Sequence, residues 1–141
     1  MRKDVRKPRR SILYVPGSNE KALKKSSTLD VDALIYDLED SVAPNAKEGA
    51  RDSLIKIINS GVNKDKEQVV RINSLDTDIG RDDLKILDHC IPDAILIPKV
   101  NSADDVVLAA GTNTSTNWQI ENPMIQADLC QICLLYTSDA A

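Results

Sequence analysis

Short apolar segments alternate with longer amphipathic ones along the chain from Ser11 to about Ala110. The apolar segments consist mainly of Ile, Val, Leu and Tyr, and parts of them are apolar at both odd and even positions. Strands covered on both faces have this composition, and strands that alternate with helices are typical of βα units around a parallel sheet. The predicted strands are SILYVPG (11–17), ALIYDLE (33–39), QVVRIN (68–73) and AILIPK (94–99).

An amphipathic segment follows each predicted strand. Apolar side chains recur in these segments three or four positions apart, which predicts helices that pack one face on the sheet. The predicted start residues are Ser18, Pro44, Asp76 or Thr77, and Ser102, and Gly61 is the predicted stop of the second helix. The predicted apolar stripes contain Leu54, Ile57 and Ile58 in the second helix and Leu84, Leu87 and Ile91 in the third. Four βα repeats leave an open sheet or a closed barrel as the topology.

The character of the chain changes after Gly111. Residues 111–141 hold three acidic residues and no basic one, and GTNTSTNW has no regular pattern. The final CLLYTSDAA resembles translated vector sequence, and the alternative is a genuine but disordered terminus. We therefore predict a basic lead-in at 1–10, a folded unit at 11–123 and a non-native or disordered tail at 124–141.

Composition and charge narrow the class of protein. The chain has 141 residues, of which 42% are hydrophobic and 28% charged, and its net charge is −4. Six of the first ten residues are basic, but no aromatic residues are interleaved, so we expect no nucleic-acid partner. We also expect no export signal and no membrane association. The three cysteines, with one isolated CxxC at Cys130 and Cys133, are typical of a reducing compartment and predict a cytoplasmic protein.

Charged residues close three of the four predicted strands. Asp37 and Glu39 end the second, Arg71 lies near the end of the third, and Lys99 closes the fourth. Parallel α/β folds gather these strand ends at one edge, where ligands bind. The alternatives are a buried ion-pair network and a functional site, and buried ion pairs stabilise proteins too weakly to favour the first. Acids together with Arg71 suit a divalent cation and an anionic substrate.

Two further polar features have weaker interpretations. Ser18 and Asn19 follow the VPG turn and open a helix, which indicates either an anion site or an ordinary cap. His89 lies late in an amphipathic segment, where a surface residue is the expected role. No serine has a His and Asp partner pattern, so a serine hydrolase is not expected.

Four segments together resemble a known family. RRSILYVPGSNEKAL, DALIYDLEDSVAPNAKEGAR, VVRINSLDTDIGRDDL and AILIPKVNSADDV are similar to the N-terminal half of the citrate lyase beta subunit and related acyl-CoA lyases of the aldolase/citrate lyase superfamily. The similarity runs from about Arg9 to Val107. It implies a (β/α)8 TIM-type barrel, truncated here to the first four or five βα units, with the fifth strand near Trp118. The second metal carboxylate and the C-terminal catalytic residues of the family are absent, which predicts that this chain alone is inactive.

The resemblance also implies a chemistry. Family members use Mg²⁺ to cleave a carbon–carbon bond in a 3-hydroxy acyl thioester, as in the conversion of a citryl thioester to an acetyl thioester and oxaloacetate. Arg71 would bind the substrate, Glu121 in WQIENP would bind the metal, and Glu39 and Asp40 would support the metal site with Lys99 paired to them. Asp37 would anchor the barrel interior. The implied partners are a carboxylate and a thioester of CoA or acyl carrier protein, in a homo-oligomer or lyase complex. A malyl- or citramalyl-CoA lyase, a thioesterase and an inactive fragment are the alternatives.

Overall fold

The computed structural model describes residues 9–100, 102, 104–105, 118–120 and 133–137. Four parallel strands form the main sheet in the order β1-β2-β3-β4. Their bounds are Ile12–Pro16 for β1, Ala33–Asp37 for β2, Glu67–Arg71 for β3 and Ala94–Ile97 for β4. The predicted α/β class and all four predicted strands are confirmed, although the hydrogen-bonded strands end one or two residues earlier than predicted.

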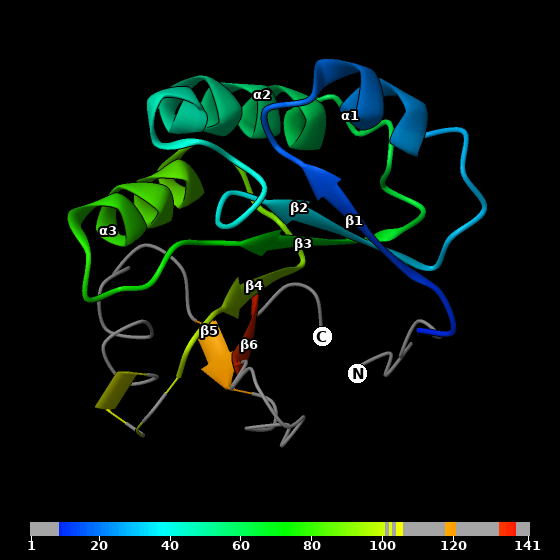
Figure 1. Cartoon of the computed structure of the whole chain (residues 1–141). Coiled ribbons are helices and arrows are strands. Elements are labelled where there is room, and N and C mark those ends of the chain that lie inside the picture. Colours follow the sequence, from blue (N-terminus) through cyan, green and yellow to red (C-terminus); the bar gives the residue numbers. More distant parts are fainter. Residues whose placement is uncertain (1–8, 101, 103, 106–117, 121–132, 138–141) are drawn as a thin grey trace.

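The helices cover one face of this sheet (Figure 1). They are α1 (Glu20–Ser26), α2 (Lys47–Asn59, after a 3-10 turn at Pro44–Ala46) and α3 (Asp78–Leu84, continued by a 3-10 helix at Lys85–Asp88). Leu54 and Ile58 of α2 pack with Tyr36 and Val70 of the strands in one buried cluster. Burial of this amphipathic face, more than helix propensity, stabilises such short helices.

The helix caps follow the sequence prediction with one correction. The N-cap of α1 is Asn19, whose Oδ1 accepts from the Ala22 amide at 3.0 Å, and the prediction of Ser18 was one residue early. Asn19 replaces Ser18 because its side chain reaches the amide three residues on. The N-cap of α3 is Thr77, and Pro44 opens the turn before α2, as predicted. Gly61 ends α2 with φ +68, a left-handed conformation that glycine adopts without strain.

The predicted stripe of the third helix was wrong at Ile91, which is 60% exposed. The α-helix ends at Leu84 and tightens into a 3-10 helix, so positions beyond it no longer follow the 3.6-residue period. Ile86 and Cys90 are buried instead. Burial raises the pKa of the Cys90 thiol to about 11, which makes it an unreactive core residue.

The sheet continues beyond β4 with a different polarity. Strand β6 (Cys133–Thr137) pairs antiparallel with β4, and β5 (Trp118–Ile120) pairs antiparallel with β6. The expected fifth strand therefore exists near Trp118, but it does not extend the parallel sheet beside β4. The edge of β4 needs a hydrogen-bonding partner, and β6 supplies it. The domain boundaries 1–10, 11–123 and 124–141 stay predictions.

Two smaller points complete the fold. Most of the fourth helix predicted after Ser102 lies outside the described residues. Within the predicted segment, the described residues 104–105 are helical. Within the part of the chain that the structure describes, no helix is long and apolar enough to cross a membrane.

Candidate active site

The ends of β2 and β3 bring Asp37 and Arg71 together. The two residues are direct partners in the parallel register and are the last residues of their strands. Arg71 donates from Nε and Nη2 to the two carboxylate oxygens of Asp37, both at 2.8 Å. Such a bidentate pair fixes the plane of the guanidinium as well as its position. The Arg71 Cζ also lies over the Tyr14 ring, 5.0 Å from the ring centroid, in a cation–π contact.

Glu39 lies two residues beyond β2 and links two cations. Its Oε2 is 3.1 Å from Arg71 Nη1, and its Oε1 is 3.1 Å from Lys99 Nζ. The predicted pairing of Lys99 with this acidic segment is confirmed for Glu39. Glu39 is 7% exposed, and Oε1 accepts no properly oriented hydrogen bond from the described residues, although Lys99 is within ion-pair distance. The carboxylate therefore has acceptor capacity to spare.

Lys99 reaches this position at a cost in backbone energy. Its φ is 55°, in the left-handed region that L-residues other than Asn and Asp rarely occupy. A non-glycine residue there costs about 1 to 2 kcal/mol. Strain of this kind persists where the surrounding structure enforces it, and it is concentrated at functional sites.

The pKa values reflect the same pairing. Burial raises the pKa of Asp37, but hydrogen bonds from Arg71, from Ser41 and from the Glu39 amide outweigh it and lower the pKa to about 2. The hydrogen bond to Asp37 raises the pKa of Arg71 above its ordinary value. Asp37 and Arg71 therefore stay ionised at every physiological pH.

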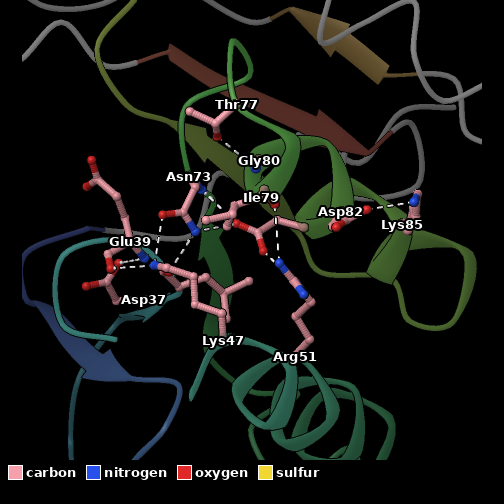
Figure 2. A network of polar contacts seen from close by, with 12 residues as sticks. Asp37, Glu39, Lys47, Arg51, Asn73, Thr77, Ile79, Gly80, Asp82 and Lys85 are labelled. Carbon is pink, nitrogen blue, oxygen red and sulfur yellow. Dashed lines mark hydrogen bonds and ion pairs between the residues drawn. The ribbon is translucent and has the colours of Figure 1, made fainter. Parts of the chain in front are cut away.

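A second layer of polar residues connects the loops that follow β2 and β3 to α2 (Figure 2). Lys47 of α2 donates to the carbonyl oxygens of Leu38 and Glu39, and to the side chain of Asn73 after β3. Asn73 Nδ2 in turn donates to the Leu38 carbonyl at 2.7 Å. These contacts tie the loops that follow β2 and β3 to each other and to the start of α2.

Arg51 and Asp83 extend this layer to α3. Arg51 Nε donates to Asp83 Oδ1 at 2.7 Å, and Asp83 Oδ2 accepts from the backbone and side-chain nitrogens of Asn73 at 2.8 and 2.6 Å. Asp83 is fully buried. Lys47 and Arg51 are four residues apart and so share one face of α2. Sequence reasoning missed Lys47, Arg51 and Asp83, although the four-residue spacing of Lys47 and Arg51 in the AKEGAR segment can be read from the sequence.

The remaining predicted site residues fall elsewhere. Asp40 is exposed at the start of the loop beyond Glu39. Glu121 lies outside the described residues. His89 is exposed, as predicted.

The described residues do not form a direct metal site by themselves. No group of three or more His, Cys, Asp or Glu side chains that could hold a metal lies within the described ranges. Both carboxylate oxygens of Asp37 already accept hydrogen bonds from Arg71, whereas Glu39 has a buried oxygen, Oε1, that accepts no hydrogen bond from the described residues. Glu39 therefore fits a role beside a hydrated Mg²⁺, and the direct ligands would come from outside the described part of the chain.

Comparison with known proteins identifies relatives of this chain. Residues 10–124 match the family described as HpcH/HpaI aldolase/citrate lyase. The (3S)-malyl-CoA thioesterase of Cereibacter sphaeroides is 48% identical over 103 residues, which are 73% of this chain and 36% of that protein. The citrate lyase subunit beta of Escherichia coli is 38% identical over 99 residues, which are 70% of this chain and 33% of that protein.

A solved structure shows the same fold. The crystal structure of protein CitE from Mycobacterium tuberculosis, in complex with magnesium, acetoacetate and coenzyme A, superposes with a TM-score of 0.62 at 29% sequence identity. The superposition covers 74% of this chain and 38% of that one. This chain thus spans about a third of the length of the curated relatives that it matches, 36% and 33% in the two named above. The chain belongs to the HpcH/HpaI aldolase/citrate lyase family.

Proposed function

We propose that this chain supplies the first βα units of a (β/α)8 barrel enzyme that cleaves a carbon–carbon bond in a 3-hydroxy acyl thioester. The proposed reaction is of the type that converts a citryl thioester to an acetyl thioester and oxaloacetate. The observation that carries the proposal is the cluster of Asp37, Glu39, Arg71 and Lys99 at the carboxyl ends of parallel strands. This edge is where barrel enzymes bind their substrates.

The reaction makes specific demands on the site. The bond between C2 and C3 of the acyl group breaks, the 3-hydroxyl loses its proton, and C3 becomes the carbonyl carbon of a 2-oxo acid. The electron pair moves into the thioester enolate, which is then protonated at C2. A cation that lies near the developing negative charge lowers the barrier, and Arg71, whose plane Asp37 fixes, is suited to hold the substrate carboxylate.

Charge balance favours a divalent cation as well. Asp37 and Glu39 carry formal charges that cancel those of Arg71 and Lys99, so the cluster has no net charge for an anionic substrate. Mg²⁺, when bound, would supply that positive charge and polarise the carbonyl. We propose that Glu39 and Asp40 support the ion from beside it and that Glu121 is a direct ligand. The relative from Mycobacterium tuberculosis was crystallised with magnesium, which supports this proposal.

A second candidate is hydrolysis of the thioester. It is favoured by the identity of 48% to the (3S)-malyl-CoA thioesterase of Cereibacter sphaeroides. A malyl- or citramalyl-CoA lyase would share the cleavage chemistry and differ in substrate. We further propose a cytoplasmic enzyme that works as a homo-oligomer or in a lyase complex, with CoA or an acyl carrier protein as the thioester carrier.

The test supplies the rest of the enzyme from a relative. The stretch of 103 residues in the Cereibacter sphaeroides protein that aligns with this chain is replaced by this chain's own residues. The chimaera is incubated with Mg²⁺ and with citryl-, citramalyl- or malyl-CoA, and both the 2-oxo acid and the free CoA thiol are quantified. The unmodified relative, under the same conditions, is the reference.

The two products separate the candidate functions. Carbon–carbon cleavage releases a 2-oxo acid with no free thiol, whereas hydrolysis releases the thiol with no 2-oxo acid. Release of the 2-oxo acid by the chimaera above the reference supports the lyase. Thiol release alone favours the thioesterase. A folded chimaera that releases neither product overturns both.

A further inference from the structure

Lys47 is a buried cation at the start of α2. Its Nζ donates to the carbonyl oxygens of Leu38 at 2.7 Å and Glu39 at 3.0 Å, and to Asn73 Oδ1 at 2.9 Å. An ammonium group has three N–H donors, so these three acceptors occupy all of them. Lys47 is 7% exposed, and all three acceptors are uncharged atoms. Figure 2 shows the side chain of Lys47 extending from its helix toward Glu39 and Asn73.

Stability alone is a poor explanation for this residue. Removing an ammonium group from water is unfavourable, and a well-packed apolar side chain would stabilise the fold at least as well. The contacts of Lys47 instead fix a local backbone conformation, because two of them are made to consecutive carbonyl groups in the turn that follows β2. That turn carries Glu39, whose carboxylate lies 3.1 Å from both Arg71 Nη1 and Lys99 Nζ.

We propose that Lys47 is a positioning residue of the active site. By holding the Leu38 and Glu39 carbonyl groups, it directs the Glu39 carboxylate toward Arg71 and Lys99. This inference rests on the proposed function. It makes a specific kinetic prediction, because the bidentate pair of Arg71 with Asp37 involves no atom of Lys47. Loss of Lys47 should therefore impair turnover more than substrate binding.

The kinetic test uses the chimaeric enzyme described above. Lys47→Met keeps the length of the side chain and removes the ammonium group. The expected result is a fall in kcat of about tenfold to a hundredfold per folded enzyme, as for other small misplacements of reacting groups, with KM changed less than about threefold. Lys56→Met is the matched control on the same helix, because Lys56 is exposed, and it should leave both constants unchanged.

A double-mutant cycle shows whether Lys47 acts through Glu39. If it does, Lys47→Met should have little further effect on kcat in an enzyme that already carries Glu39→Gln. A residue with only a structural role would lower kcat by the same factor in both backgrounds. Such additive losses, or a kcat of Lys47→Met within about twofold of the parent, would overturn the proposal.

A second measurement on the 141-residue chain needs no activity. The Val42 amide donates to the Glu39 carbonyl oxygen, which is one of the atoms that Lys47 holds. Amide hydrogen exchange at Glu39 and Val42 should accelerate at least about tenfold in Lys47→Met and stay unchanged in Lys56→Met. Unchanged exchange in Lys47→Met would overturn the proposal. If the unsubstituted chimaera releases no product, the proposed function fails, and the exchange experiment still decides whether Lys47 orders the Glu39 turn.

Discussion

Replacing Asp37 by Asn removes the charge that fixes Arg71 while leaving the shape of the side chain almost unchanged. Asp37 is 2% exposed, and its carboxylate accepts five hydrogen bonds: two from Arg71, one from the Glu39 amide, and two from Ser41, through its amide and its hydroxyl. The substitution leaves a guanidinium that is 18% exposed without its bidentate partner. Arg71 then keeps only its ion pair with Glu39, whose Oε2 lies 3.1 Å from Nη1, and because breaking a buried ion pair is destabilising, we expect a loss of stability.

The magnitude follows from the pKa of Asp37. The pKa falls from an ordinary value of 3.8 to about 2 in the folded chain. Each pKa unit corresponds to 1.36 kcal/mol, so ionised Asp37 contributes about 2 kcal/mol to the free energy of unfolding. The lowered pKa means that this contribution is complete above pH 3.8 and disappears as the pH falls toward 2.

Urea unfolding of the 141-residue chain, followed by circular dichroism at a series of pH values, measures this contribution. At pH 7 Asp37→Asn should lose about 2 kcal/mol or more, and the difference from the unsubstituted chain should shrink between pH 4 and pH 2. The matched control is Asp32→Asn. Asp32 also has a pKa of about 2, but its partner Arg10 is 80% exposed, and solvent weakens such a pair.

Two outcomes would refute this reasoning. The first is a difference between Asp37→Asn and the unsubstituted chain that stays constant from pH 7 to pH 2. The second is an equal loss for Asp32→Asn and Asp37→Asn, because it would mean that burial of the Asp37 pair adds nothing.

Three further predictions concern the same edge of the sheet. Arg71→Lys should lower kcat/KM of the chimaera at least about tenfold, because an ammonium cannot make two parallel hydrogen bonds, and near-normal kinetics would exclude the clamp. Lys99→Gly should lower turnover but raise the free energy of unfolding by up to about 1 kcal/mol, because glycine adopts a φ of 55° without strain. A variant less stable than the parent would contradict the inference that the Lys99 backbone is strained. Gly80→Ala should lower the free energy of unfolding, measured in urea, by about 2 kcal/mol or more, because the new Cβ would lie 2.1 Å from the Ser74 carbonyl oxygen. The matched control is Gly49→Ala, whose Cβ meets no atom within 4 Å and which should stabilise α2. Equal effects of the two alanines would contradict the crowding at Gly80.

The strands and the charged strand ends could be predicted from the sequence because both depend on local pattern. The four strands could be predicted from the apolar runs. Parallel strands have their carboxyl ends at one edge of the sheet, and this brings together Asp37, Arg71 and the Glu39–Lys99 pair. The bidentate contact itself depends on register, since Asp37 meets Arg71 only when both are the last residues of their strands.

Features that depend on long-range contacts were not predictable in this way. A lysine in a helix is usually a solvated residue, and the burial of Lys47 arises only when α2 packs across the loops that follow β2 and β3. The pairing of β6 with β4 likewise depends on which segment reaches the edge of the sheet. The cap of α1 was missed by one residue because Ser18 and Asn19 both have capping side chains and only the geometry of the turn selects between them.

The most direct test of the proposed function is the ratio of 2-oxo acid to free CoA thiol released by the chimaera from malyl-, citramalyl- and citryl-CoA. We predict 2-oxo acid as the main product from at least one of these thioesters, in a reaction that requires Mg²⁺ and falls at least about tenfold in Arg71→Lys. A folded chimaera that releases only free thiol, or that keeps its full rate of 2-oxo acid release in Arg71→Lys, would contradict it.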